Sequence, residues 1–365
     1  MLISADLFIS FISIKAYNYF MNKGMKGIDK MTKKQRVIKA VNHVETGIVP
    51  YNIYFTHQEY EKVAEYLKDY GFIGKIGNYI SNADCTAQQH ELSPGSGYWK
   101  DEFGVVWNKN GADKDIGVID SLVLQAPEIN SLIMPEVNTA YIRNAVESML
   151  KDSDDKFRVV SLGFSMFERA WSLAGMENIL IYMLTDPEFV EELMDRILEH
   201  NLKIIDIALE YDIDCFHFGD DWGQQKGLIM GPVCWRRFIK PGVSKMYERV
   251  KNSGKIVSQH SCGDISEIFP DLIDIGLDIY QTFQPEIYDI RKVKQEYGSS
   301  LTFWGGISTQ RLLPFASPGE VKRVVSETIG ILGKGGGYIA APTHAVPGDV
   351  PPENIAALIE ALKNQ

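Results

Sequence analysis

The chain has 365 residues, of which 45% are apolar, and it carries a formal net charge of −11. This length and apolar content suffice for one large α/β domain or for two of medium size. The negative charge disfavours a nucleic-acid-binding protein, which needs a basic face to neutralise phosphates, although a local basic pocket for an anionic ligand stays compatible with it.

The first 30 residues are predicted to form an N-terminal helical extension outside the main fold. Residues 2–20 are fairly apolar, but Asp6 and Lys15 interrupt them, and they lack the basic start and cleavage site of a signal peptide. The same interruptions disfavour a membrane span. Helical signals begin at Met31, so we expect the fold to occupy residues 31–365, and an upstream start codon would explain the extension.

Residues 76–125 are less regular and rich in aromatic side chains, among them Tyr98, Trp99, Phe103 and Trp107. A long insertion of this kind between early strands often forms a lid over an active site. An ordinary packed β-excursion explains the same residues equally well.

Short apolar runs alternate with helix-like segments from about residue 155 onward, which is typical of βαβ units and a parallel sheet. With two earlier candidates the pattern gives eight strands, which favours a single (β/α)8 TIM barrel over a doubly wound sheet. Neither a glycine-rich dinucleotide motif nor a phosphate-binding loop is present. The predicted strands cover residues 50–55, 118–124, 157–164, 215–219, 256–259, 278–283, 301–304 and 337–341.

Polar residues recur where the later strands end. Because the carboxyl ends of barrel strands meet at one face, where active sites form, we expect these residues to converge. Structural alternatives stay open: an Asp often caps a helix, a Gly supplies unusual backbone angles, and loop amides, carboxylates and histidines are often solvated or structural. In chain order the residues of interest at these strand ends are Asp220, Asp221, His260, Cys262, Gln284, Glu286, Trp304, Gly305, Gly306 and His344.

The pair His260 and Cys262 predicts a metal site. Residues i and i+2 of a strand share a face, so an imidazole and a thiol would project together at the end of a buried strand. With His344 they would supply three ligands and an open fourth position, the arrangement of catalytic zinc. One thiolate and two neutral ligands leave the ion a net charge of about +1, which favours Lewis-acid chemistry. Core filling by the same two side chains is the alternative.

Other metal and nucleophile motifs do not compete with this prediction. The chain has no His-Glu-x-x-His zinc-protease motif and no Gly-x-Ser-x-Gly hydrolase motif. Its four cysteines, Cys85, Cys215, Cys234 and Cys262, are too scattered for a disulfide framework or a zinc finger. Reduced thiols in a cytoplasmic enzyme fit this pattern best.

The chain resembles the uroporphyrinogen decarboxylase superfamily over about residues 32–363, most densely after residue 210. That superfamily is known for a (β/α)8 barrel, and the resemblance is to its corrinoid-dependent methyltransferase branch. The segments that carry it are Gly219-Asp220-Asp221-Trp222-Gly223, Trp235-Arg236-Arg237-Phe238, His260-Ser261-Cys262-Gly263-Asp264-Ile265, Gly276-Leu277-Asp278, Trp304-Gly305-Gly306-Ile307, and the run from Gly335-Gly336-Gly337-Tyr338 to Pro351-Pro352-Glu353-Asn354-Ile355.

The resemblance implies a zinc-dependent methyltransferase. Those enzymes bind zinc through a His-x-Cys pair and a later cysteine, and they activate a thiol such as coenzyme M. His260 and Cys262 match the pair, but His344 stands where the later cysteine is expected. An imidazole there would leave zinc a stronger Lewis acid, suited to a departing oxygen. We therefore expect a demethylase-type enzyme that passes a methyl group between a small methylated substrate or thiol and a corrinoid carried by a partner protein.

Two alternatives remain. A uroporphyrinogen decarboxylase of porphyrin biosynthesis would use Asp220 or Asp221 and His344 near the pyrroles, and His344 falls where that enzyme has a histidine. The decarboxylase also carries an arginine-rich motif for substrate carboxylates, whereas the matching residues 49–55 contain no arginine. A non-catalytic binding protein on the same barrel is the other alternative.

We expect catalytic roles for Asp220, Asp221 and His344. The residues expected to contact the substrate are Tyr54, Glu168, Gln284, Trp304 and Gly305.

Overall fold

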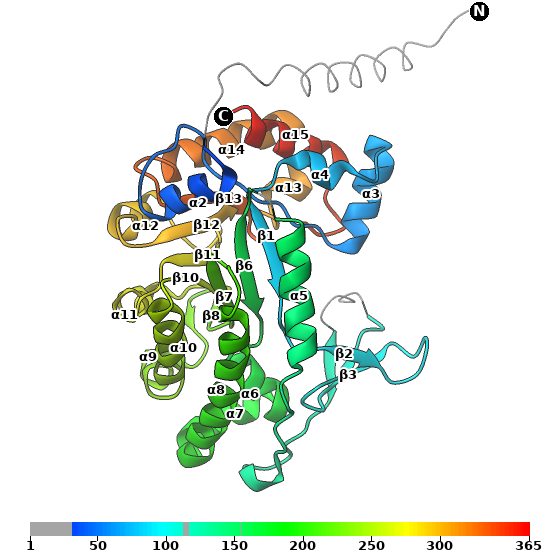
Figure 1. Ribbon diagram of the computed structural model, residues 1–365, viewed down its shortest axis with the longest axis vertical. Helices are drawn as coiled ribbons and strands as arrows, with labels where there is room; N and C mark the ends of the chain where they lie inside the picture. The colour runs from blue at the N-terminus through cyan, green and yellow to red at the C-terminus, as the bar shows by residue number, and fades with distance from the viewer. Residues whose placement is uncertain (1–30, 112–116, 154) are drawn as a thin grey trace, which may run out of the picture. The chain divides into compact units, whose positions relative to one another are not determined.

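Seven parallel strands form the main sheet, in the order β1-β6-β7-β10-β11-β12-β13, and Figure 1 shows them curled together with helices around them. The computed structural model describes residues 31–111, 117–153 and 155–365, so the extension predicted over residues 1–30 lies outside the described residues. The strands are β1 (Ile80–Asp84), β6 (Phe157–Leu162), β7 (Cys215–Gly219), β10 (Ile256–His260), β11 (Ile279–Phe283), β12 (Thr302–Ile307) and β13 (Tyr338–Pro342).

Residues 50–52 lie between the two edges of this sheet. Tyr51 forms a parallel bridge with Ala340 of β13. On the other side, the backbone amide of Tyr79, just before β1, donates a hydrogen bond to the Tyr51 carbonyl at 3.1 Å. The parallel α/β class predicted from the sequence is confirmed, with a curled sheet of the kind found in TIM-type barrels.

The prediction that residues 118–124 form a barrel strand is wrong. The strand found there, β5 (Val118–Ser121), pairs with an antiparallel neighbour, and most of its side chains are exposed. Its place in the parallel sheet belongs to β1, whose sequence Ile-Ser-Asn-Ala-Asp is too polar to form an apolar run. The apolar-run criterion fails for β1 because part of its inner face lines a polar cavity, described below.

A small antiparallel sheet accounts for the aromatic-rich insertion. It has the order β2-β3-β4-β5, with β2 (Gln89–Glu91), β3 (Tyr98–Asp101) and β4 (Val106–Asn108). Asp101 and Arg169 of α6 (Phe167–Ala174) form an ion pair of 2.8 Å whose side chains are only 1% and 5% exposed. Arg169 also lies 4.0 Å above the ring of Phe103. The insertion is therefore anchored as a packed β-excursion.

Several helices begin at side chains that cap them. Asn138, Asp289 and Ser317 each accept a hydrogen bond from a backbone amide in the first turn of the helix that follows. The remaining helices are α2 (Lys33–Val41), α3 (His57–Leu67), α4 (Phe72–Ile76), α5 (Thr139–Lys151), α7 (Met176–Thr185), α8 (Pro187–Leu209), α9 (Gly231–Cys234), α10 (Lys240–Asn252), α11 (Phe269–Asp274), α12 (Ile290–Tyr297), α13 (Leu312–Phe315), α14 (Pro318–Leu332) and α15 (Pro352–Lys363).

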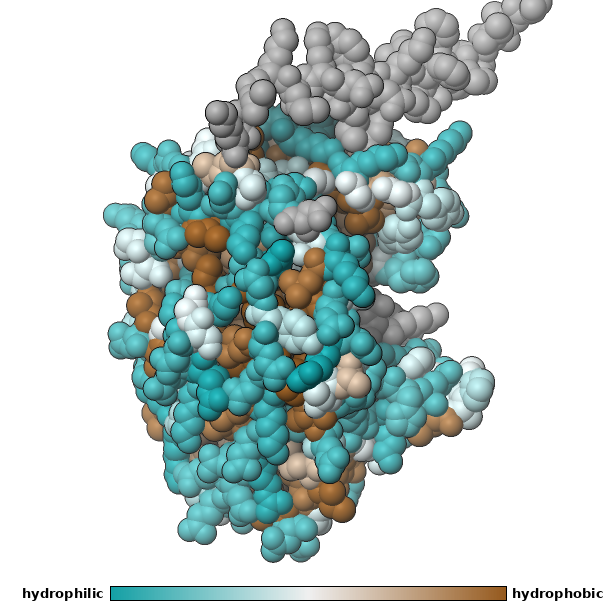
Figure 2. Space-filling model, in the orientation of Figure 1, coloured by the Kyte–Doolittle hydropathy of each residue, from teal (hydrophilic) through white to brown (hydrophobic). Residues whose placement is uncertain are grey.

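Short elements complete the chain. They are the β8–β9 hairpin (Gly223–Gln224 and Gly227–Leu228), the 3-10 turns Ile129–Ser131 and Ser266–Ile268, and a π-helical turn at Trp235–Ile239. Polar residues, drawn in teal, cover much of the visible face in Figure 2, as expected for amphipathic helices that turn their apolar sides inward. Among the described helices, none has the length and apolar content needed to span a membrane.

The sheet separates two apolar clusters. The larger cluster fills the space between the sheet and the helices. The smaller cluster lies inside the curl, where Val37 and Val41 of α2 pack with strand residues such as Val159, Cys215 and Ile339. Because α2 contributes to this inner cluster, the helix seals the interior at the amino-terminal ends of the strands.

Inward-facing residues change from apolar to polar along five strands. Residues two apart in a strand share a face, so the residue two positions after each inner-cluster member points into the same interior, nearer the carboxyl end. The interior therefore has an apolar floor and, above it, a polar layer. The changes are Ile80 to Asn82, Val159 to Ser161, Cys215 to His217, Ile256 to Ser258 and Ile279 to Gln281.

The buried Asp101–Arg169 pair gives a stability prediction. We expect Arg169→Ala to lower the free energy of unfolding by about 3 kcal/mol, because the buried Asp101 carboxylate loses its countercharge. Arg143→Ala is the matched control, since the Arg143–Glu210 pair of 2.8 Å is about half exposed and should contribute less than about 1 kcal/mol. Urea denaturation measures both, and equal losses for the two variants would contradict the anchoring role of the buried pair.

Candidate metal centre

Three potential zinc ligands meet at the carboxyl ends of the strands. Cys262 Sγ lies 3.6 Å from His260 Nε2 and 3.3 Å from His344 Nε2. The three ligand atoms all lie within 4.8 Å of one another. His260 ends β10, Cys262 follows it by two residues, and His344 follows β13 by two residues. The structure thus brings together the three residues that were predicted to bind the metal.

Gln281 of β11 orients the His260 ring. The parallel register of β10 and β11 places the two residues side by side. The carboxamide oxygen of Gln281 is hydrogen bonded to His260 Nδ1. Because this oxygen can only accept, Nδ1 carries a proton, and Nε2 is the nitrogen that faces Cys262 and would bind a metal. A second hydrogen bond of this kind is the usual support of a metal-binding histidine.

Asp221 makes the position between these ligands favourable for positive charge. Its Oδ1 accepts a hydrogen bond of 2.8 Å from the Cys262 amide and lies 3.3 Å from His260 Nε2. Burial opposes charge on His260, yet hydrogen bonds with Asp221 and Cys262 hold the pKa of His260 well above its usual value. Burial likewise works to raise the pKa of Asp221, but its hydrogen bonds with His260 and Cys262 lower it instead. A cation bound here would be stabilised by the Asp221 carboxylate and the Cys262 sulfur.

The donor set fits zinc. Two imidazole nitrogens and one sulfur are zinc's usual ligands, and three protein ligands leave a fourth position for a substrate. Burial lowers the pKa of His344 to about 4, with His260 adding to the shift, so this ring is neutral and able to donate its lone pair. Burial raises the pKa of the Cys262 thiol, so a bound metal must displace its proton.

Asp220 differs from its neighbour Asp221 because it is fully buried and saturated by hydrogen bonds. Its two oxygens accept from the backbone amides of Phe167 and Glu168 at 2.9 and 2.8 Å, and from the Trp222 indole at 2.6 Å. The carboxylate therefore caps the start of α6, a helix that lies earlier in the chain. A catalytic role for Asp220 stays a prediction.

Glu168 carries a proton near neutral pH. Burial raises the pKa of its carboxyl to about 8, and the nearby Asp221 and Asp220 add to the shift. A protonated carboxyl can donate a hydrogen bond, which distinguishes Glu168 from the ionised Asp221.

Two glycines let the loops after β7 and β10 approach closely. A Cβ on Gly263 would lie 2.3 Å from the carbonyl carbon of Gly223, and one on Gly223 would lie 2.5 Å from the carbonyl oxygen of Cys262. Gly263 has a φ of +74°, which also favours glycine. Gln284 accepts a hydrogen bond of 2.9 Å from the Gly263 amide. These contacts fix the backbone that carries Cys262.

A cavity of about 270 Å³ lies beside the ligand group and is lined by His260 and His344. Of the five predicted substrate contacts, Tyr54 and Trp304 line it, whereas Glu168, Gln284 and Gly305 do not. Gly305 instead has a φ of +137° and packs against the backbone of Phe283. The sequence did not predict the other polar side chains of the lining, Asn52, Asn82, Ser161, His217 and Gln281.

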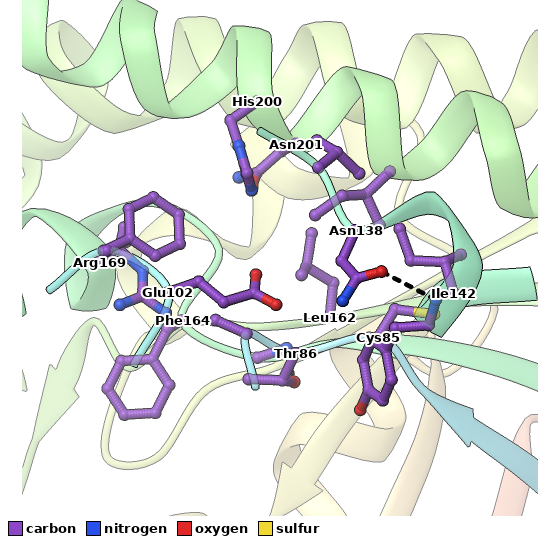
Figure 3. Close-up of a pocket in the computed structure, with 16 residues that line it drawn as sticks. Cys85, Thr86, Glu102, Asn138, Ile142, Leu162, Phe164, Arg169, His200 and Asn201 are labelled. Atoms are coloured by element: carbon purple, nitrogen blue, oxygen red, sulfur yellow. Dashed lines mark hydrogen bonds between the residues drawn. The ribbon is translucent and has the colours of Figure 1, made fainter. Parts of the chain in front are cut away.

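A second pocket lies near the ends of β1 and β6, beside the antiparallel sheet (Figure 3). The Glu102 carboxylate points into it, and His200 and Asn201 reach it from α8. Its volume of about 20 Å³ leaves room for about one water molecule. None of the three potential zinc ligands lines this pocket.

A family model described as "Uroporphyrinogen decarboxylase (URO-D)" matches residues 110–365. The chain belongs to this family. The resemblance predicted from the sequence is thereby confirmed.

The individual relatives described here are named either as a methyltransferase or as a uroporphyrinogen decarboxylase. A methylated-thiol–coenzyme M methyltransferase of Methanosarcina mazei is 22% identical over 222 residues, which cover 61% of this chain and 57% of that protein. A uroporphyrinogen decarboxylase of Coxiella burnetii is 21% identical over 258 residues, which cover 68% of this chain and 69% of the relative. The match thus spans little more than half the length of the first relative.

A solved structure of a methyltransferase from Methanosarcina mazei has the same fold. It superposes with a TM-score of 0.68 at 16% sequence identity, covering 92% of this chain and 99% of that chain.

Removal of the thiol tests the metal centre directly. We expect the purified protein to carry about one zinc per chain and Cys262→Ala to lose most of it, because one of three ligands is gone. Cys234→Ala is the control, since Cys234 lies on α9 outside the ligand group. Elemental analysis by mass spectrometry measures the zinc, and equal zinc in both variants would exclude Cys262 as a ligand.

The Gln281 hydrogen bond gives a graded prediction. Gln281→Leu should weaken zinc binding by about 10- to 100-fold without removing a ligand, because the His260 ring loses its orientation. Competition with a chelator of known affinity measures the change. Gln125→Leu, at an exposed position, is the control. An unchanged affinity in Gln281→Leu would show that Gln281 does not support the metal site.

Proposed function

We propose that this protein is a zinc-dependent methyltransferase that moves a methyl group between a small methylated substrate or thiol and a corrinoid carried by a partner protein. The observation that carries the proposal is the group His260, Cys262 and His344, whose ligand atoms lie within 4.8 Å of one another. The Gln281 hydrogen bond to His260 Nδ1 supports it, because that bond leaves Nε2 directed toward the group.

Each residue of the site has a distinct task in this proposal. Zinc held by His260, Cys262 and His344 would act as a Lewis acid on the substrate atom that carries the methyl group. Asp221 holds the Cys262 loop in place through the Cys262 amide. Glu168, protonated near neutral pH and close to Asp221 and His260, would donate a hydrogen bond or a proton. The cavity beside the two histidines would hold the rest of the substrate.

His344 favours removal of a methyl group over activation of a thiol. The ligand set carries a single negative charge, from Cys262, because His344 is a neutral imidazole. A less electron-rich site withdraws charge from a departing oxygen or sulfur more strongly. This charge count supports the demethylase direction.

The decarboxylase activity is the weaker candidate. Several relatives carry that name, but the substrate of such an enzyme has many carboxylates, which call for arginine or lysine partners. Among the described residues, no arginine or lysine lines the cavity beside His260. A non-catalytic binding protein does not account for three potential metal-ligand atoms within 4.8 Å of one another.

We also propose a single (β/α)8 barrel domain over residues 31–365, with residues 50–52 as the eighth strand. Their contacts to both edges of the parallel sheet support it. The extension over residues 1–30 and a cytoplasmic location remain predictions from the sequence.

A paired assay tests the proposal. The zinc-loaded protein is incubated with a reduced corrinoid and either a methyl ether or a methyl thioether, and separately with uroporphyrinogen. We expect demethylated product by mass spectrometry, lost in Cys262→Ala, and no coproporphyrinogen. Conversion of uroporphyrinogen by zinc-free protein would favour the decarboxylase instead, and no turnover in either arm would favour the binding protein.

The variant His344→Cys sharpens the same assay. It should keep zinc, because a thiolate replaces an imidazole, but the ratio of ether to thiol activity should fall at least roughly tenfold as the ion becomes less electrophilic. An unchanged ratio would show that the third ligand does not set the direction of the chemistry.

A further inference from the structure

The cavity beside the metal centre is polar but carries no side-chain carboxylate, ammonium or guanidinium. Among the residues that the structure describes, no Lys, Arg, Asp or Glu lines it. Asn82, Ser161, His217 and Gln281 supply polar groups to the lining, and Trp304 lies beside His217, with the two ring centres 5.4 Å apart. Away from the metal ligands, a charged group moved from water into such a site loses its hydration and finds no side chain of opposite charge in the lining. The lining therefore selects against both anionic and cationic substrate groups.

Among the polar side chains of the cavity lining, His217 has one ring nitrogen without a hydrogen-bond partner among the described residues. Asn82 Nδ2 donates to Ser161 Oγ at 3.1 Å, and Gln281 is engaged with His260. His217 Nδ1 lies 2.8 Å from Ser258 Oγ, whereas its Nε2 makes no hydrogen bond with any residue that the structure describes. The ring of His217 is thus fixed at one nitrogen and available at the other.

His217 lies where it could contact a substrate group next to the methyl group that is transferred. Its ring centre lies 6.4 Å from that of His260 and 5.4 Å from that of Trp304. Because His217 and His260 line the same cavity, a substrate that fills it beside the metal ligands would lie against His217.

The part of the site beside the metal ligands has room for a small substrate. Its volume of about 270 Å³ corresponds to about nine water molecules at ~30 Å³ each. Tyr54 and Asn82 line both this cavity and a wider groove of about 640 Å³, so these two residues stand where the two spaces meet.

We propose that the substrate is a small uncharged methylated compound with a hydroxyl, carbonyl or amide group, and that His217 binds this group as a specificity-determining residue. The inference rests on the proposed methyl transfer, but the selective binding that it predicts is measured without turnover.

Four small methyl ethers test the charge selection. They are 2-methoxyethanol, which is neutral, 2-methoxyethanesulfonate, protonated 2-methoxyethylamine and 1-methoxypropane, which lacks the polar group. Neither the sulfonate nor the ammonium group is a good zinc ligand, so the comparison reports on the cavity. By ligand-observed NMR titration of the zinc-loaded protein, we expect 2-methoxyethanol to bind at least about tenfold more tightly than either charged probe. A charged probe that binds as tightly as the alcohol would overturn the substrate class.

Variants of His217 test its role. His217→Leu should weaken 2-methoxyethanol about fivefold to tenfold, the loss of one hydrogen bond, and leave 1-methoxypropane unchanged. His217→Gln keeps a donor and an acceptor and should restore binding to within about twofold. Equal affinity of the unmodified protein and His217→Leu for the alcohol would refute the assignment. If the leucine variant does not fold, equal binding of the alcohol and 1-methoxypropane to the unmodified protein would refute it as well.

This test separates the two proposals. Selective binding of the alcohol in a protein that shows no methyl transfer would refute the proposed function alone. Methyl transfer with no preference among the charged and neutral probes would refute only the substrate class.

Discussion

The parallel register of β7, β10 and β11 is the constraint on which the site depends. It places His260 level with Gly219 on one side and with Gln281 on the other. Because side chains alternate along a strand, a slip of one residue would turn His260 out of the interior. The same register brings Gln281 to the His260 ring and positions the loop of Asp221 beside Cys262. One set of backbone hydrogen bonds thus fixes the ligand, its support and its nearest carboxylate.

The sequence revealed the ligands but not their supports. His260, Cys262 and His344 could be predicted because strand ends of a parallel sheet converge, and their residue types are distinctive. Gln281 could not, because its role depends on which strand lies next to β10. Asp220 illustrates the same limit: it caps a helix 53 residues earlier in the chain, a partner that no local pattern indicates.

The polar layer explains why one strand was not recognised and why His217 was overlooked. Apolar runs identify strands only where both faces are buried in apolar surroundings. In β1 the inner face carries Asn82, so the run is broken, whereas the exposed β5 has enough β-branched residues to resemble a strand of the core. The available signal was the switch from Cys215 to His217 two residues later, which repeats in four other strands. This switch indicates a polar interior only when the inward-facing residues of each strand are known.

The layered interior also reconciles stability with binding. Five polar side chains inside a sheet would be costly if left without partners, and hydrogen bonds between neighbouring strands satisfy several of them, as in the pairs Asn82–Ser161 and His217–Ser258. The apolar floor and α2 below them exclude water from the amino-terminal half. Because each bond links two strands, the side chains are held in place before a substrate arrives. The site is therefore preorganised. A ligand with a matching polar group loses little affinity, because few side chains have to become ordered when it binds.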